Sequence, residues 1–305
     1  MSTVTSPPDT GTRSQRPDAP TGLGRRLGFV IVLVVAVLAW NAAGLQIDKL
    51  LRAPGRIVDL AGLLFLPPQW DSFGIAMSGM LESVQMAWLG TLIAAFLSLP
   101  LSLLAARNVS GRFGSEAVRQ VLNGIRAFPE LVLVILIVTV FGLGPVTGTI
   151  ALGIHSIGTL GKLSSEAVES IDRGPLEAVD AVGGTWAQRM RWGVLPQAMP
   201  EIVAFWLYRF EINIRASAVL GVVGAGGIGA QLTETLRYKE FGRAGMAFIV
   251  VVGVTLMIDA ISGRIRRRII AGAAVDHDIG TDAKMALETD PVIAAEAGAI
   301  RDGEV

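Results

Sequence analysis

The sequence contains no cysteine and only two histidines, one of them in the polar C-terminal part. Without cysteine the chain forms neither a disulfide nor a thiolate metal site, and its redox compartment is left undetermined. A nucleophile–base pair or a metal cluster is not recognisable either, so the sequence predicts no catalytic residue and no metal site. The formal net charge of zero excludes nucleic-acid binding through a globally basic surface.

Charged residues are also scarce: they make up 17% of the chain, against about 25% in an average soluble domain. They are absent altogether from Leu27–Ile47, Ser83–Ala106 and Leu131–Gly161. Each stretch reaches the roughly 20 residues that a helix needs to cross a bilayer. A helix buried in a large soluble core is the alternative, which this length disfavours. The sequence therefore predicts an all-α polytopic membrane protein.

We expect about six spans, with a turn at Gly142–Pro145 dividing the longest apolar run. The expected spans are Leu27–Leu45, Met80–Ala105, a segment ending near Phe141, Val146–Ala167, a segment from after Pro200 to Val223, and Ala244–Ile261. The first is interpreted as a retained anchor rather than a signal peptide, because it is long and has no clear small-x-small cleavage site.

The remaining segments define the expected domain organisation. Residues 1–22 are rich in Pro, Ser, Thr, Asp and Gly, which predicts a disordered cytoplasmic tail. Residues 23–74 would hold the first span and an extracytoplasmic connection, and residues 75–265 the core. Residues 266–305 are Ala-, Gly- and Asp-rich, and we expect a mobile cytoplasmic tail there.

Lysine and arginine indicate the orientation, because they accumulate on the cytoplasmic side of membrane proteins. With a cytoplasmic N-terminus, twelve basic residues fall on inner flanks and six on outer flanks. We therefore expect both termini, and the polar segment 173–196, to be cytoplasmic. The inner positions are Arg25, Arg26, Arg107, Arg112, Arg119, Arg173, Arg189, Arg191, Arg264, Arg266, Arg267 and Arg268, and the outer ones are Lys49, Arg52, Arg56, Arg237, Lys239 and Arg243.

The polar segment 173–196 has the pattern of two short helices. Pro175 suits the first turn of a helix, and Glu177 follows where the helix dipole favours a carboxylate. Ala178, Ala181 and Val182 recur at helical spacing as a narrow apolar face. Gly183-Gly184 would end this helix, and Thr185–Gln188 fits a capping box that starts a second one. An ordinary interfacial helix with coincidental residues is the alternative.

An acidic residue, small residues, a glycine and, after a fixed gap, Leu195-Pro196 together resemble the EAA loop of ABC-importer permeases. The resemblance implies that this loop couples the membrane subunit to a separate ATPase. The coupling positions would be Glu177, Ala178, Ala181, Gly183, Leu195 and Pro196. The sequence departs from the family pattern at two positions. Val179 stands where many relatives have alanine, and Gly193 stands where an aliphatic residue is common. We expect the missing aliphatic side chain at position 193 to weaken packing before Leu195.

Further blocks resemble the permeases of phosphonate/phosphate-type ABC importers over residues 75–265. They are Arg126–Leu131, Gly142–Pro145, His155–Gly158, Gly161–Leu163, Ser165-Glu166, Phe210–Arg215 and Val219–Gly229. The resemblance implies a type I ABC importer transmembrane fold with a cytoplasmic coupling helix, in a bacterial inner membrane. It also implies alternating access, a second permease copy (a homodimer is favoured), two cytoplasmic ABC ATPase subunits and an extracytoplasmic substrate-binding protein. ATP and Mg would be used by the partner ATPase, since this chain has no Walker A sequence and is expected to bind no cofactor.

Ionisable groups in apolar segments are costly and usually face the bundle interior or a pathway. The expected oxyanion pathway therefore comprises His155, Ser156, Lys162, Arg209, Glu211 and Arg215. Competing interpretations are an ion pair between Glu211 and Arg215 at i,i+4, and an interhelical hydrogen bond for His155. For Glu130, the dipole at a helix N-terminus is a sufficient explanation.

The glycine-rich run 221–229 has no preceding strand and no P-loop lysine, so nucleotide binding is disfavoured. Its glycines would form either an outer gate or a site of close helix packing, and we take packing as the default. The positions are Gly224, Gly226, Gly227 and Gly229. Rival functions for the chain are a methionine-type amino-acid importer permease, an ion-coupled secondary transporter and a membrane scaffold without transport activity.

Overall fold

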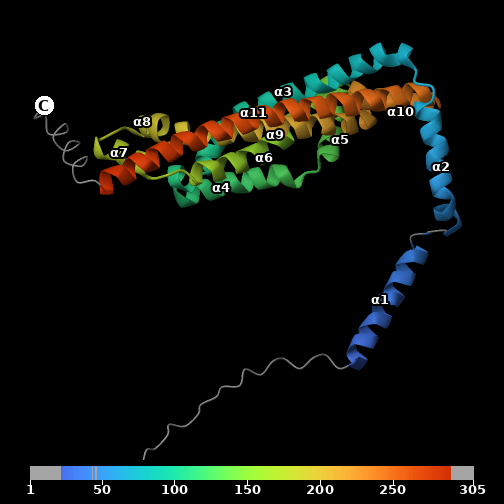
Figure 1. Cartoon of the computed structure of the whole chain (residues 1–305), viewed down its shortest axis with the longest axis horizontal. Coiled ribbons are helices and arrows are strands. Elements are labelled where there is room, and N and C mark those ends of the chain that lie inside the picture. The colour runs from blue at the N-terminus through green and yellow to red at the C-terminus, as the bar shows by residue number, and fades with distance from the viewer. Residues whose placement is uncertain (1–21, 43, 45–46, 290–305) are drawn as a thin grey trace, which may run out of the picture. The chain divides into compact units, whose positions relative to one another are not determined.

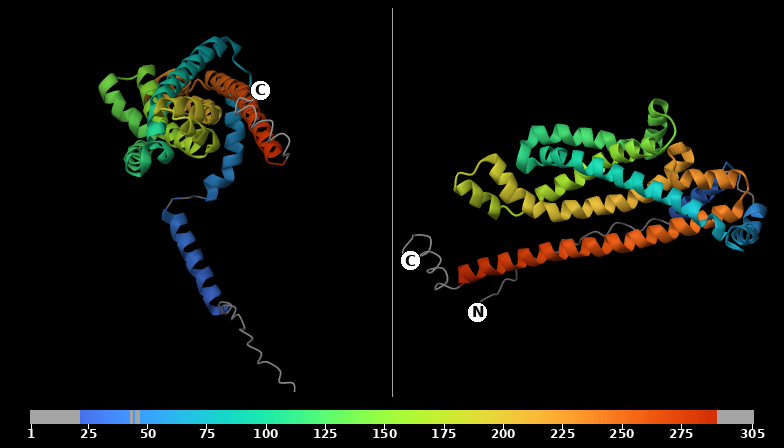
Figure 2. Two further views of the ribbon diagram at one scale, coloured as in Figure 1. Left: turned by 90° about the vertical axis from the view of Figure 1, so that its left-hand side faces the viewer. Right: turned by 90° about the horizontal axis from the view of Figure 1, so that it is seen from above.

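The computed structural model describes residues 22–42, 44 and 47–289, and these residues form helices with no strand among them. The expected N-terminal tail, except its last residue, and residues 290–305 of the expected C-terminal tail lie outside this described part. The chain divides into two compact units, Met1–Leu60 and Ala61–Val305. The elements of the second unit are shown in Figures 1 and 2.

The first unit contains α1 (Gly22–Ala42), which matches the expected first span. A second helix, α2 (Ile47–Phe65), follows and continues into the second unit. The sequence did not predict it, because Pro54-Gly55 interrupts the pattern and proline disfavours a helix interior. An i,i+4 ion pair of 2.9 Å between Asp48 and Arg52 supports the first turns of α2.

The second unit is a bundle of long helices: α3 (Phe73–Ala105), α6 (Pro145–Glu169), α9 (Leu195–Leu220) and α11 (Phe241–Thr289) lie alongside one another (Figures 1 and 2). Small residues bring α3 and α6 together. A Cβ at Gly90 would lie 3.1 Å from the Thr149 carbonyl oxygen, so any larger residue would push the two helices apart by a few tenths of an ångström. Close packing through small residues is how membrane helices gain van der Waals contact.

The expected third span corresponds to α5 (Glu130–Phe141), which ends at Phe141 as predicted. A separate helix, α4 (Arg107–Ala127), precedes it, and the two are bent by 85° relative to each other. Phe128 is extended at φ −81°, ψ 123° because the following residue is Pro129. With twelve residues, α5 is about 18 Å long, which is too short to cross a bilayer alone.

By length and apolar composition, three helices in the described residues are able to cross a membrane, or five if two bent pairs each count as one span. We expected about six, and α6 accounts for the difference. Its Gly, Ser and Thr residues lower its mean hydropathy. More than half of its residues are buried within the bundle, so it needs no continuous apolar face toward lipid.

Helix α11 continues past residue 265, the expected end of the core, as far as Thr289. Phe241–Thr289 contains no proline, and the next one is Pro291, so no residue in this stretch forces the helix to end. The remaining elements are η1 (Trp70–Ser72), α7 (Gly174–Ala181), α8 (Trp186–Gln188), η2 (Arg189–Val194), η3 (Gly221–Ala225) and α10 (Gly227–Arg237). Of these, η2 and η3 are π-helical and flank α9.

Candidate functional site

The segment 173–196, which we call the polar bracket, lies at one end of the bundle and joins α6 to α9 (Figure 1). Pro175 falls in the first turn of α7 and Glu177 is its acidic first-turn residue, as the sequence predicts. Leu176 is the one buried residue of α7, with 5% of its surface exposed. It belongs to an apolar cluster that includes Val194 and Ala198 from the segment that returns into α9.

The glycines end α7 as predicted. Gly183 has φ +74°, a conformation that side chains rarely adopt, and nothing lies within 4 Å of where its Cβ would be. The Gly184 N–H donates to the Val179 carbonyl at 2.9 Å, and the Gly183 N–H donates to the Asp180 carbonyl at 3.1 Å. These two bonds form a Schellman motif, so the helix stops at a fixed residue.

The capping box that starts α8 is also confirmed. The Thr185 N–H donates to Gln188 Oε1 at 2.7 Å, and the Gln188 N–H donates to Thr185 Oγ1 at 3.4 Å. Both residues of the motif therefore satisfy backbone donors that a helix start leaves free.

The structure corrects the expectation that Gly193 weakens packing before Leu195. Gly193 is buried, and a Cβ at this position would lie 3.3 Å from Cδ1 of Leu176. The leucine of α7 thus fills the space that an aliphatic residue would take at position 193. The apolar contact is kept, but its side chain comes from the neighbouring helix.

Polar contacts fix the polar bracket to the start of α9. Gln197 Oε1 accepts from the Asp172 N–H at 3.0 Å, and Gln197 Nε2 donates to the Gly193 carbonyl at 2.7 Å. Within the bracket, Arg189 Nε lies 3.7 Å from Asp180 Oδ1. The bracket is therefore held by side chains as well as by its short connections.

The outer surface of the bracket combines small side chains with a carboxylate and larger apolar groups. Glu177, Ala178 and Ala181 are exposed, and Val182 is 84% exposed. The aromatic rings of Trp186 and Trp192 are exposed beside them, and the Arg191 guanidinium lies 5.4 Å from the centre of the Trp192 ring. Of the expected coupling positions, Leu195 is half-buried while Gly183 and Pro196 are exposed. Sequence reasoning missed the two tryptophans as surface residues, although aromatic residues in a polar segment are a recognised mark of contact surfaces.

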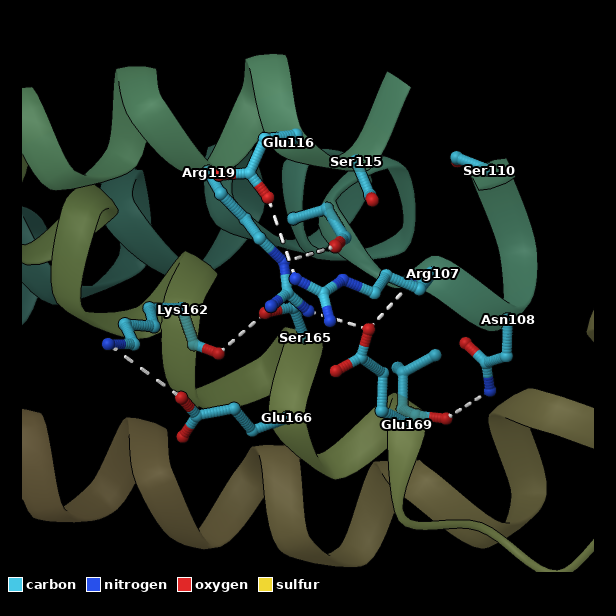
Figure 3. A network of polar contacts seen from close by, with 12 residues as sticks. Arg107, Asn108, Ser110, Ser115, Glu116, Arg119, Lys162, Ser165, Glu166 and Glu169 are labelled. Carbon is cyan, nitrogen blue, oxygen red and sulfur yellow. Dashed lines mark hydrogen bonds and ion pairs between the residues drawn. The ribbon is translucent and has the colours of Figure 1, made fainter. Parts of the chain in front are cut away.

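A second polar cluster, which we call the α4–α6 clasp, ties the start of α4 to the end of α6 (Figure 3). Arg119 Nη2 lies 2.6 Å from Glu169 Oε1, and the same oxygen accepts from the Arg107 N–H at 2.6 Å. Asn108 Nδ2 donates to the Val168 carbonyl at 2.7 Å. Glu169 is the last residue of α6 before the polar bracket, so the clasp joins α4 to the bracket.

Lys162 lies in this region, apart from the other residues of the expected pathway. Its Nζ lies 3.9 Å from Glu166 Oε1 (Figure 3). Together with Arg107, Arg119 and Glu116 these residues line a cavity of about 160 Å³. The lining carries three cations and two carboxylates, and Arg119 is already paired with Glu169, so little positive charge is left for an anion.

His155, Ser156 and Arg209 do come together, in the interior of the bundle. Arg209 is 5% exposed, and its Nε donates to Ser156 Oγ at 2.8 Å. Its Nη2 lies 2.7 Å from Glu130 Oε1 and 2.7 Å from His155 Nδ1. The same carboxylate oxygen is 2.9 Å from His155 Nδ1. This nitrogen faces both a donor and an acceptor, so it serves one of them at a time.

Two further buried side chains complete this interior cluster. Asn213 Nδ2 donates to Thr91 Oγ1 at 2.9 Å and to Ser156 Oγ at 3.0 Å. The cluster thus joins α3, α5, α6 and α9 by hydrogen bonds at a depth where water is scarce. The sequence did not reveal that Glu130 is a member. The available signal was that a carboxylate beside apolar helices needs a partner of opposite charge.

Glu211 and Arg215 point away from the interior cluster and toward α11. Arg215 Nη2 donates to both carboxylate oxygens of Asp259 at 3.0 Å. Glu211 Oε1 lies 3.6 Å from Arg266 Nη1. The ion pair between Glu211 and Arg215 is therefore not formed. Spacing along α9 does place Arg209 and Glu211 on different faces, as predicted.

The glycine run interrupts the helix beyond the C-terminal end of α9. Gly224, Gly226 and Gly227 all have positive φ, and the Gly224 carbonyl accepts from the Gly144 N–H at 2.9 Å. A Cβ at Gly229 would collide with the carbonyl oxygen of Ala218. Positive φ explains the first three glycines and close approach of the backbone explains Gly229, and a role as a gate stays a prediction.

Residues 98–271 match the family described as binding-protein-dependent transport system inner membrane component, and the chain belongs to this family. Its long helices are those of a membrane component of such a system, and its fold is the type I ABC importer transmembrane fold.

Among individual relatives, the chain is similar to the phosphite transport system permease protein PtxC of Stutzerimonas stutzeri. The two are 37% identical over 253 residues, which cover 81% of this chain and 91% of the relative. This chain is also similar to the phosphate-import permease protein PhnE of Mycolicibacterium smegmatis. The two are 43% identical over 207 residues, which cover 67% of this chain but 39% of that protein.

Solved structures support the fold alone, because their sequence identities are low. The inward-facing methionine ABC transporter MetNI has a TM-score of 0.57 at 22% identity, covering 66% of this chain and 99% of that chain. A bacterial ABC transporter involved in alginate import has a TM-score of 0.57 at 15% identity, covering 80% and 97%.

Proposed function

We propose that this chain is the translocation subunit of an ATP-driven importer that carries phosphonate, phosphate or a related oxyanion into the cytoplasm by alternating access. The observation that carries the coupling part of the proposal is the polar bracket. It presents small exposed side chains at its tip, while a buried leucine and a glutamine amide fix it to the bundle. Similarity to the phosphite permease PtxC along most of both chains supports the substrate class.

The proposed assembly follows from what this chain supplies and what it leaves to others. ATP and Mg²⁺ are bound and used by a separate cytoplasmic ATPase, present in two copies. Glu177, Ala178, Ala181 and Gly183 contact this ATPase, and Leu195-Pro196 passes the movement into α9. A second copy of the permease, an extracytoplasmic substrate-binding protein and membrane lipid complete the importer.

The proposed orientation places both termini, the polar bracket and the α4–α6 clasp on the cytoplasmic side of a bacterial inner membrane. The glycine run at the opposite end of α9 then faces the extracytoplasmic side, where an outer gate has to open toward the binding protein. An ATPase in the cytoplasm meets the bracket directly in this arrangement.

The test is ATP hydrolysis and uptake by the permease reconstituted in vesicles with its ATPase and binding protein. Phosphate, phosphite, methylphosphonate and methionine are supplied separately. Stimulation by one of the oxyanions is expected. In the variant Glu177→Ala/Gly183→Ala we expect this stimulation to be lost, because the contact residue is removed and an alanine at φ +74° is strained by about 1–2 kcal/mol.

The matched control is Glu234→Ala/Gly253→Ala, which removes an exposed carboxylate from α10 and adds a methyl group where nothing lies within 4 Å. It should keep the stimulated rate. Stimulation by methionine alone would retain the importer and overturn the substrate class. Uptake that depends on a proton or sodium gradient without ATP would overturn the ATP-driven mechanism.

A further inference from the structure

The interior cluster contains a set of hydrogen-bond donors that converge on a single oxygen. Oε1 of Glu130 lies 2.7 Å from Arg209 Nη2 and 2.9 Å from His155 Nδ1. A guanidinium and an imidazole meeting at one anionic oxygen is the arrangement that also binds an oxygen of phosphate or phosphonate. Here the anion is part of the protein.

Arg209 is held in place independently of Glu130. Arg209 Nε donates to Ser156 Oγ, and Asn213 donates to Ser156 and to Thr91. These residues come from α3, α6 and α9, which pack together along the bundle (Figure 1). Arg209 therefore keeps its position if the carboxylate leaves, and His155 remains beside it.

The Glu130 carboxylate, by contrast, comes from a short helix next to a bend in the chain. Glu130 is the first residue of α5, directly after the break at Phe128-Pro129 where α4 and α5 are bent by 85°. The peptide nitrogen of Pro129 carries no hydrogen, so this residue donates no backbone hydrogen bond back toward α4. Its carbonyl accepts from the Val132 and Leu133 N–H groups of α5, and these bonds travel with α5 when its angle changes. The break is thus a place where Glu130 is able to move relative to α6 and α9.

Charge gives the second argument. In the part of the chain that the structure describes, Glu130 is the one carboxylate paired with Arg209. Glu211, two residues along α9, faces Arg266 of α11 instead. When Glu130 withdraws, the buried Arg209 is left without a counter-ion, which is costly in an apolar interior unless another anion replaces it. An oxyanion of the size of phosphate supplies that charge.

We propose that Arg209 and His155 form an oxyanion-binding site inside the bundle, and that the Glu130 carboxylate occupies this site in the present conformation. Substrate and Glu130 exclude one another, so the site is open to the transported anion only when α5 has moved away. The inference rests on the proposed function for the identity of the anion, and it adds a binding site and a reason why the permease in the present conformation does not hold substrate.

The experiment measures equilibrium binding of radiolabelled methylphosphonate and phosphate to the complete permease–ATPase complex in lipid nanodiscs, without the binding protein. Glu130→Gln removes the competing charge and keeps an amide oxygen for Arg209. We expect affinity for both anions to rise about tenfold or more over the unsubstituted complex, because a desolvated charge competitor is lost. Glu130→Gln/Arg209→Gln should bind neither, and the control Glu234→Gln on α10 should bind like the unsubstituted complex.

Three results would overturn the proposal. The first is unchanged anion affinity in an assembled Glu130→Gln complex. The second is an anion affinity in the Glu130→Gln/Arg209→Gln variant equal to that of Glu130→Gln alone, and the third is a gain in methionine affinity equal to the gain for the anions. A loss of thermal stability with no gain in binding would identify an ion pair that only holds helices together. Failure of the proposed function shows separately, as absence of oxyanion uptake by the unsubstituted importer with its binding protein, and does not affect the binding comparison.

Discussion

One buried side chain holds α7 against the rest of the protein, and its removal has a calculable effect. Leu176 is 5% exposed and packs with Val194 and Ala198, whereas the other residues of α7 are exposed or half-buried. Burying a leucine side chain contributes about 1.5–3 kcal/mol, and Leu→Ala in a core costs about 2–5 kcal/mol. For a site at the edge of the bundle we take about 2–3 kcal/mol as the loss in Leu176→Ala.

Native-state hydrogen exchange measures this loss where it occurs. A docking free energy lower by about 2–3 kcal/mol corresponds to exchange about 30- to 150-fold faster for the amides bonded within α7. Amides in the middle of α6 and α9 should keep their protection, since the leucine does not contact them. ATP-stimulated uptake should fall in the same variant, because an undocked α7 no longer passes movement to α9.

The control is Val182→Ala, which removes two methyl groups from a side chain that is 84% exposed. It should change α7 exchange by less than about twofold, as surface substitutions usually alter stability by less than about 0.5 kcal/mol. The reasoning is refuted if Leu176→Ala leaves α7 protection as high as in this control. The helix would then be held by its connections and not by its buried face.

Three further changes test other parts of the structure. Gly193→Val should speed α7 exchange, because its Cβ lies 3.3 Å from the leucine anchor of α7 and overpacking costs about 1–3 kcal/mol. Arg119→Gln and Glu169→Gln should show a coupling of about 1–2 kcal/mol in a double-mutant cycle on thermal unfolding, because the pair is 2.6 Å apart and three-quarters buried; additive effects would contradict the clasp. Gly229→Ala should prevent assembly of a stable permease, as judged by size-exclusion chromatography, whereas Gly253→Ala in open space should assemble normally.

Local features were predictable because their signals lie within a few residues. The start of α7 at Pro175, its end at Gly183 and the capping box at Thr185 each depend on neighbouring backbone groups. Long apolar runs likewise fixed the positions of α1, α3 and the apolar part of α11. None of these required knowledge of which helices are neighbours.

Pairing between helices was not predictable, because it depends on rotation and depth of elements far apart in the chain. Arg215 donates to Asp259, which is 44 residues away, and not to Glu211 on its own helix. Glu130 reaches Arg209 across 79 residues. Composition indicated that each charge needed a partner, but a single sequence carries no information on which one.

Helices that contradict local propensity were also missed. α2 contains Pro54, and α4 and α5 are separated by a break whose angle of 85° is set by how both segments pack on α6. Propensity is a weak prior that tertiary packing overrides. The proline signalled a boundary at residue 129, but not that both sides of it belong to one bent pair.

Helices α6 and α9 form a hairpin with polar cross-links at both ends. At the polar bracket, the Gln197 side chain bonds the backbone of Asp172 and so ties the start of α9 to the end of α6. At the far end, the Gly144 N–H beside the start of α6 donates to the Gly224 carbonyl beyond the end of α9. Cross-links at both ends resist sliding of one helix along the other.

The middle of the same hairpin is cross-linked by Arg209, whose Nε donates to Ser156 of α6 at 2.8 Å. Arg209 lies fourteen residues from the start of α9, or about 21 Å from the polar bracket along the helix. A hairpin linked at three levels moves as one body, so a displacement at the bracket is carried to this depth. Glu130 is the charged partner of Arg209 that comes from outside the hairpin, on α5. A movement of the hairpin relative to α5 would separate Arg209 from its counter-ion while keeping its bond to Ser156, which is the change that the proposed anion site requires.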